Sequence, residues 1–425
     1  MHGGTLAGRI RRLGVAMALL LAGAVPAQAA HPARSAAPPA SIVGYWLGEE
    51  IIARPGETRS DPSAYYSPAD RSALTPEVWR LLGAYRVPLY LNVRYGRDFG
   101  PLHPGVRSDA AALVRKANAL GIPVTAWIVV PREQGYWAYQ GNARSMFAAV
   151  KAWAAWKKAN HLTFAAVALD QEFSWQNLHA YVAAVTSHDS EALSTWMRGN
   201  IDPAAQCSAL QTYRELISWA HREGVRVDAA EAPMVVDDLA DGKLALQNGL
   251  QIAGSSPGYD RMYLMAYRSA VSAGGADPGP AYSASYYRSM QKYFGAAGQV
   301  SLGIAGKGPY ATVTALADEV RMLVGLGAKE IPIYSLEEML SKYGPEGVKA
   351  LAEAAQHPME GSELARFVKP TPASEAGLAV SRSHDAAASE LTVAVTRQQG
   401  RPQSPNAWPE GCGDLSVHPL VKTRD

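Results

Sequence analysis

Eight short apolar runs alternate with longer amphipathic segments in the middle of the chain, and this alternation constrains the fold more than any other feature. The runs are SIVGYW at residue 41, VPLYLNV at 87, IPVTAWIVV at 122, TFAAVAL at 163, VRVDAA at 225, RMYLMAY at 261, QVSLGIA at 299 and KEIPIYSL at 329. Several of them follow a helical pattern that ends in a glycine-containing turn, as in NALGIPV and HREGVRV. A strand that follows a helix, repeated eight times, indicates parallel strands joined by crossover helices.

The number of repeats favours a closed barrel over an open, doubly wound sheet. No glycine-rich dinucleotide-binding turn follows the first run, although such a turn is typical of the open fold. Near-continuous apolar strands are typical of a sheet that is covered on both faces. The sequence therefore predicts an α/β fold with one domain, a (β/α)8 TIM barrel over residues 41–357. In this architecture, catalytic side chains lie at the C-terminal ends of the strands.

The two ends of the chain differ from the middle. Arginines followed by the apolar run LGVAMALLLAGAV and the small residues AQA predict a cleavable signal peptide over residues 1–29. The mature protein is then expected to be secreted or periplasmic, and no later apolar run is long enough for a membrane-spanning helix. Residues 30–40 are interpreted as a Pro/Ala linker, and residues 358–425 as a flexible C-terminal tail.

Composition and residue spacing argue against several classes of partner. A net charge of +2 on 425 residues provides no field that favours nucleic acid or an anionic membrane. The two cysteines, Cys207 and Cys412, are expected to be unpaired, although an oxidising compartment would permit a disulfide. The His and Cys residues lack the close spacing of a metal site, and the glycines of GIAGKGPY do not match a phosphate loop. We therefore expect neither a metal nor another cofactor.

Aromatic and acidic side chains gather at the predicted C-terminal ends of the strands. A sugar offers an apolar face to aromatic rings and hydroxyl groups to polar neighbours. This combination favours a poly- or oligosaccharide as the ligand. The predicted substrate-binding residues are Trp46, Tyr95, Trp137, Trp175, Arg268 and Tyr334.

The fourth run ends in two acids that share one face of the strand. Asp170 and Glu172 have the same parity as Ala166 and Ala168 in FAAVALDQEFSW. Neighbours on one face of a strand are roughly 6–7 Å apart along the backbone, so the charge of one acid raises the proton affinity of the other. Such a pair suits general acid catalysis, whereas bonds to loop amides and to solvent would give it a purely structural role.

Four segments together resemble the chitinase-type barrels of glycoside hydrolase family 18, namely ALDQE, LMAYR, SLGIAG and IPIYSLE. The resemblance implies that Glu172 is the general acid, that Asp170 lies beside it and that Tyr267 helps to hold the N-acetyl group of the sugar. The acetamido oxygen of the substrate would then attack the anomeric carbon. The chain departs from the family pattern at Ala165 and Ala168, where two further aspartates are usual.

Other departures leave alternative functions open. Arg268 follows Tyr267 where an acid or amide is usual, and Tyr334 stands in place of a tryptophan. If the acetamido mechanism is lost, Glu231 is the first candidate for a second carboxylate that acts as nucleophile or base. The sequence thus predicts an exported glycoside hydrolase-like protein. The alternatives are a catalytically inactive barrel that binds carbohydrate or a protein partner, and a cell-wall muramidase similar to glycoside hydrolase family 25, which also has D-x-E after the fourth strand.

Overall fold

The computed structural model describes the larger part of the chain. The described residues are 42–48, 63–66 and 71–379, with gaps at 107, 179, 181–189, 234, 242–243, 255–256 and 274–275, and also 382, 388, 390 and 391. The predicted signal peptide (residues 1–29) and linker (residues 30–40) lie outside this part. None of the helices formed by the described residues is both long and apolar enough to cross a membrane.

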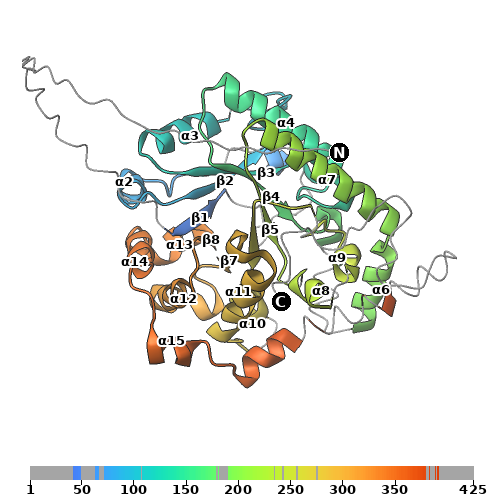
Figure 1. Cartoon of the computed structure of the whole chain (residues 1–425). Coiled ribbons are helices and arrows are strands. Elements are labelled where there is room, and N and C mark those ends of the chain that lie inside the picture. Colours follow the sequence, from blue (N-terminus) through green and yellow to red (C-terminus); the bar gives the residue numbers. More distant parts are fainter. Residues whose placement is uncertain are drawn as a thin grey trace, which may run out of the picture. The chain divides into compact units, whose positions relative to one another are not determined.

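Eight parallel strands close into a barrel in the order of the sequence (Figure 1). The strands are β1 (Val43–Leu47), β2 (Leu89–Arg94), β3 (Val124–Val129), β4 (Ala166–Gln171), β5 (Val227–Glu231), β6 (Arg261–Met265), β7 (Gly298–Gly303) and β8 (Ile331–Tyr334). Strand β8 completes the ring by pairing in parallel with β1. Each predicted apolar run overlaps one strand, so the predicted (β/α)8 fold is confirmed.

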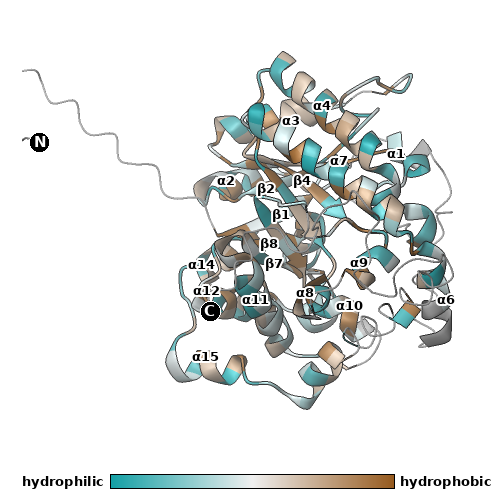
Figure 2. Cartoon of the chain, turned by 45° about the vertical axis from the view of Figure 1, so that its right-hand side comes forward, coloured by the Kyte–Doolittle hydropathy of each residue, from teal (hydrophilic) through white to brown (hydrophobic). Residues whose placement is uncertain are grey.

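Helices surround the barrel and connect its strands. The longer ones are α2 (Pro76–Ala84), α3 (Ala110–Ala119), α4 (Ala143–Ala159), α6 (Ser190–Asn200), α7 (Pro203–Arg222), α11 (Pro280–Phe294), α12 (Val313–Gly325), α13 (Leu336–Tyr343) and α14 (Glu346–Ala354). The shorter ones are α1 (Ser63–Tyr66), α8 (Val235–Asp241), α9 (Ala245–Gly249), α10 (Arg268–Ala273) and α15 (Gly361–Phe367). Thr75 and Thr312 cap the N-termini of α2 and α12 by accepting hydrogen bonds from backbone N–H groups. Hydrophilic residues colour the outer turns of α4 and α7 in Figure 2.

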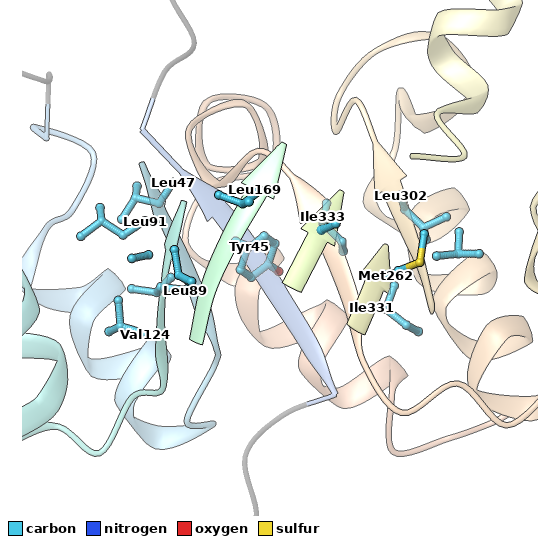
Figure 3. Packing of buried hydrophobic residues seen from close by; sticks show 14 of the residues in the cluster. Tyr45, Leu47, Leu89, Leu91, Val124, Leu169, Met262, Leu302, Ile331 and Ile333 are labelled. Carbon is cyan, nitrogen blue, oxygen red and sulfur yellow. The ribbon is translucent and has the colours of Figure 1, made fainter. Parts of the chain in front are cut away.

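Side chains along the strands alternate between the helical layer and the barrel interior. The outward-facing residues pack against the helices in the main core, and those labelled in Figure 3 are Tyr45, Leu47, Leu89, Leu91, Val124, Leu169, Met262, Leu302, Ile331 and Ile333. The inward-facing residues form a second cluster that includes Trp46, Tyr90, Trp127, Ala168, Ala230 and Tyr263. Because every strand buries both faces, apolar residues occupy both parities.

Charged pairs lie at the N-terminal end of the barrel. Arg226 donates two hydrogen bonds, of 2.9 and 2.8 Å, to the carboxylate of Asp228 on β5. Arg261, at the start of β6, forms an ion pair with Glu330 just before β8. Burial raises the pKa of Asp228 to about 6, although Arg226 and Arg261 act in the opposite direction.

We expect the Asp228→Asn substitution to remove part of the pH dependence of stability. The pKa of Asp228 rises from 3.8 to about 6 on folding, so the folded chain binds this proton more tightly than the unfolded chain. Stability then falls as the pH rises through this window. A shift of about two units corresponds to about 3 kcal/mol. Urea unfolding should show that the free energy of unfolding falls between pH 4 and pH 7 by about 3 kcal/mol less in the variant than in the wild type. An equal decrease in both proteins would contradict the assignment.

The chain after residue 357 differs from the flexible tail that the sequence predicted. Glu363 of α15 forms an ion pair with Arg321 of α12 at 3.0 Å. Residues 372–379 are helical, and Leu378 in this stretch is buried in the main core. A few apolar side chains in an alanine-rich stretch make these contacts, so the composition resembled that of a linker. The residues beyond 379 are described only at four positions.

Cys207 on α7 is disulfide-bonded, and only 8% of its surface is exposed. The expectation of an unpaired thiol at this position is therefore wrong. Its possible partner, Cys412, lies outside the described residues. Two cysteines so far apart in the sequence give no local sign that they meet, because their distance depends on the tertiary fold.

Candidate active site

Strand β4 directs two acids toward the interior at the C-terminal end of the barrel. Ala168 belongs to the inward-facing cluster, and Asp170 has the same parity two residues further along β4. Asp170 is 5% exposed. Glu172 follows the strand, and its N–H donates to the carbonyl oxygen of Ala138 at 3.2 Å. Glu172 is half-buried and has the same parity as Asp170 one residue beyond the strand.

Gln171, between the two acids, points the opposite way and is held by two hydrogen bonds. Its Nε2 donates to the hydroxyl oxygen of Tyr259 at 2.8 Å. Its Oε1 accepts from the backbone N–H of Ala253 at 3.2 Å. Because this side chain is fixed on the outer face of β4, rotation of the strand end is restricted. Asp170 and Glu172 therefore remain on the other face.

Four aromatic residues, here called the aromatic wall, connect the barrel interior with its C-terminal rim. The members are Trp46 on β1, Trp127 on β3, Tyr267 after β6 and Tyr334 on β8. Trp46 and Trp127 meet edge to face with ring centroids 5.3 Å apart, and Trp127 meets Tyr334 at 6.4 Å. Tyr334 stacks on Tyr267 at 6.0 Å. The Nε1 of Trp46 donates to the Oγ of Ser301 at 3.2 Å, which fixes the innermost ring.

Tyr267 is positioned by close packing on strand β7. A Cβ atom added to Gly303 would lie 2.9 Å from Cδ1 and 3.0 Å from Cε1 of the Tyr267 ring. Any larger residue at position 303 would therefore displace the ring. The absence of a side chain at Gly303 lets the half-buried Tyr267 reach its stacking partner Tyr334.

A second group of aromatic residues lies at the ends of β3 and β4. Trp137 and Trp175 have ring centroids 5.2 Å apart, and Tyr136 contacts both rings. The guanidinium of Arg132 lies 4.3 Å from the centre of the Trp175 ring, a cation–π contact that restrains the indole. The structure thus brings Trp137 and Trp175 together, and Trp175 follows Glu172 by three residues in the sequence.

Two predicted substrate-binding residues lie elsewhere. Tyr95 has the parity of the outward-facing residues of β2, and it packs against the main core and Phe99. The guanidinium of Arg268 binds Asp277 at 2.7 Å and also pairs with the buried Glu319 of α12. Both assignments are therefore corrected to structural contacts. The prediction for Tyr95 was wrong because both parities of a barrel strand are buried, so its direction could not be inferred from the sequence. The prediction for Arg268 was wrong because its partners come from distant segments of the chain.

Glu231 is also on the outer side of the barrel. It shares its face with Val227 and Ala229 of the main core, and its ladder partner on β4 is Gln171. It is fully buried, and neither carboxylate oxygen has a hydrogen-bond partner in the described part of the chain. Burial therefore raises its pKa well above the usual range. The assignment of Glu231 as a second catalytic carboxylate is wrong, because its side chain is directed away from Asp170.

Trp127 and Arg94, two inward-facing residues of β3 and β2, were not among the predicted site residues. Trp127 lies beside Ala168 in the β3–β4 ladder. Arg94, at the end of β2, donates from Nε to Asn92 Oδ1 at 2.9 Å and from Nη1 to the carbonyl oxygen of Tyr65 at 3.0 Å. Burial lowers the pKa of Arg94. Polar residues that alternate with Leu89, Leu91 and Val93 were the available signal for the inward parity of this strand.

Side chains that could bind a metal are not grouped together in the described part of the chain. There, no group of three or more His, Cys, Asp and Glu side chains could hold a metal ion. The expectation of a metal-free, cofactor-free protein remains a prediction.

Comparison with known proteins finds solved structures with similar folds but no similar sequence. No protein-family model matches the chain, and no curated protein matches its sequence. Similar solved structures include the glycoside hydrolase domain of PgaB (BpsB) from Bordetella bronchiseptica, at 14% identity, 76% coverage of this chain, 100% coverage of that chain and a TM-score of 0.44. A GH18 chitinase from Pseudoalteromonas aurantia has 12% identity, coverages of 73% and 99%, and a TM-score of 0.39. A chitinase from Chromobacterium violaceum has 11% identity, coverages of 75% of this chain and 98% of that chain, and a TM-score of 0.42.

Proposed function

We propose that the protein is an exported glycoside hydrolase in which Glu172 is the general acid and Asp170 assists beside it. The observation that supports this proposal best is the pair of acids at the C-terminal end of β4, on the side opposite the fixed Gln171. This end of a (β/α)8 barrel is where catalytic side chains are found. Tyr267 and Tyr334, the half-buried members of the aromatic wall, offer rings on which the apolar face of a sugar can stack.

The two acids have different exposures, which suits different roles. Glu172 is half-buried and able to reach a substrate, whereas Asp170 is almost fully buried. In the proposed reaction Glu172 gives its proton to the glycosidic oxygen as the bond from the anomeric carbon to this oxygen breaks. Asp170 stabilises the positive charge that develops on the substrate.

The position of Glu231 narrows the choice of nucleophile. Because Glu231 faces the helical layer, it is not available to attack the sugar. We assign the attack to the acetamido oxygen of a 2-acetamido sugar, which forms a bond to the anomeric carbon as the leaving group departs. Water then opens this intermediate, and the Glu172 carboxylate takes up a proton from the water. The proposed substrate class is therefore a glycan with N-acetylated amino sugars, such as chitin oligomers or the peptidoglycan cleaved by a muramidase.

A binding protein without catalysis is the second candidate. The observation that favours it is Ala168, which leaves the inner face of β4 without an acid directly below Asp170. A carboxylate at this position would be close enough to influence the charge of Asp170. Without it, the aromatic wall could still hold a glycan while proton transfer is lost.

Export is the second part of the proposal and depends on the sequence of residues 1–29. The disulfide at Cys207 supports it, because disulfides persist mainly in oxidising compartments. Determination of the N-terminus of the protein recovered outside the cytoplasm tests this part. A mature N-terminus near residue 30 is expected, and retention of residues 1–29 on the recovered protein would contradict it.

The substrate panel that tests the enzymatic proposal should contain chitin oligomers, peptidoglycan and an N-acetylglucosamine exopolysaccharide. The purified protein is expected to release reducing sugar from at least one of them. The fully deacetylated form of each active substrate should be resistant, because it lacks the acetamido oxygen. Binding to a glycan without release of sugar would instead favour the binding protein. Equal cleavage of both forms would exclude the acetamido mechanism.

A further inference from the structure

The segment that follows Glu172 is supported by helix α6. The ring of Phe173, the residue next to Glu172, contacts the ring of Trp196 on α6 edge to face, with centroids 5.7 Å apart. Phe173 is buried, and Trp196 is half-buried. The position of α6 therefore influences the backbone that carries the candidate acid.

Helix α6 in turn packs on residues from the far C-terminal part of the chain. A hydrophobic cluster separate from the main core contains Met197 and Ile201 at the end of α6 and Leu246 and Leu250 at α9. Ala388 and Leu391 are buried in the same cluster, and Trp196 packs against it. Ala388 is 0% and Leu391 6% exposed. Ala388 and Leu391 thus pack in a cluster to which α6, α8 and α9 contribute.

The beginning of α7 provides a covalent attachment close to this cluster. Cys207 lies six residues after Ile201 and is disulfide-bonded. The chain contains one other cysteine, Cys412, which is 21 residues beyond Leu391. An extended chain covers about 3.3 Å per residue, so this length is ample to return from the cluster to Cys207.

We propose that Ala388 and Leu391 form a C-terminal brace for α6, and that Cys412 is the disulfide partner of Cys207 and fastens this part of the chain to α7. The brace packs Ala388 and Leu391 on α6, and α6 holds Phe173 through Trp196. Closing the disulfide joins the two Sγ atoms and transfers two electrons and two protons to a disulfide-bearing oxidant of the export compartment. Reduction removes the covalent link, and among the described residues the attachment then depends on the burial of Ala388 and Leu391, so oxidation keeps the segment after Glu172 in place.

The brace is tested on the oxidised full-length mature protein by peptide mapping and hydrogen exchange. Non-reducing digestion should yield one linked peptide that contains Cys207 and Cys412. The Cys207→Ser and Leu391→Ser variants should exchange amide hydrogens in residues 190–201 about tenfold faster than the wild type. Exchange in β3 should not change. Leu120→Ser, at a partly exposed leucine far from the cluster, serves as the control and should leave residues 190–201 unaffected.

Three results would contradict the proposed brace. Absence of the linked peptide would show that Cys412 is not the partner. Unchanged exchange in residues 190–201 would show that the C-terminal residues do not support α6. Faster exchange in β3 and α6 alike would indicate a general loss of stability. The exchange readout does not depend on the proposed function: an oxidised protein that cleaves no glycan but shows the local effect would retain the brace and lose the hydrolase.

Discussion

Replacing Glu172 by glutamine should lower kcat on the glycan that the wild type cleaves by about 10²- to 10⁴-fold, the usual contribution of a positioned general acid. Glutamine keeps the size and hydrogen-bonding capacity of the side chain but has no proton to give to the glycosidic oxygen. Because Glu172 is half-buried at the end of β4 and outside the main core, the free energy of unfolding should change little. Glycan affinity should also be retained, since the aromatic wall is unchanged.

Glu133→Gln is the matched control for this substitution. Glu133 is an exposed acid of the 3₁₀ turn Arg132–Gln134, which follows β3 at the same rim of the barrel. The charge change is identical, so a general electrostatic effect on glycan binding would appear in both variants. Steady-state kinetics and isothermal titration with the same oligomer separate kcat from affinity. If Glu172→Gln retains wild-type kcat, Glu172 is not the proton donor.

The barrel could be predicted because its signal is repeated. One apolar run with a glycine turn before it is ambiguous, but eight in order leave few alternatives to a closed parallel barrel. Strand β4 was also clear, since Asp170 and Glu172 interrupt an otherwise apolar run at its C-terminal end. These inferences use only the period of the side chains and the polarity of the chain.

The direction of individual side chains could not be predicted from the same signal. On β5, both Val227 and Ala230 are buried, so parity alone does not show which of them faces the interior. The outward parity was therefore taken for the inward one, and Glu231 was assigned to the site. A barrel strand contacts helices on one side and other strands' side chains on the other, and both environments are apolar.

Contacts between distant segments could not be predicted from the sequence either. The partners of Arg268 come from a loop and from α12, and Leu391 reaches a cluster formed largely by α6 and α9. Neither contact has a local pattern in the sequence. Alanine-rich segments bury little surface per residue, so composition places the one around residue 388 with linkers, although Ala388 and Leu391 are buried in a cluster.

Replacing Glu231 by leucine should stabilise the protein, although it alters a fully buried position. The carboxyl group has no hydrogen-bond partner in the described part of the chain, and such a group costs about 1–3 kcal/mol. Leucine has a comparable size and would share the outer face of β5 with Val227 and Ala229 of the main core, so urea unfolding at pH 7 should show a gain of about 1–3 kcal/mol. Activity should remain within about twofold of the wild type, because Glu231 faces away from Asp170.

The sign of the pH dependence provides a second measurement. The pKa of Glu231 is raised in the folded protein, so the folded chain holds this proton at pH values where the unfolded chain has lost it. The wild type is thus destabilised as the pH rises from the ordinary value of 4.5 through the raised pKa. Leucine cannot ionise, and the stabilisation by Glu231→Leu should therefore be greater at pH 8 than at pH 5.

Glu319→Leu is the matched comparison, because it removes an equally buried glutamate that has partners. Glu319 accepts hydrogen bonds from Arg268 and Ser283, and its loss leaves the Arg268 charge buried beside fewer acceptors. Breaking a buried ion pair costs about 3–5 kcal/mol, so this variant should be destabilised while Glu231→Leu is stabilised. A Glu231→Leu variant that is destabilised and has lost activity would instead mean that Glu231 makes a contact essential to the reaction. Glu231 would then again be the candidate for the second catalytic carboxylate.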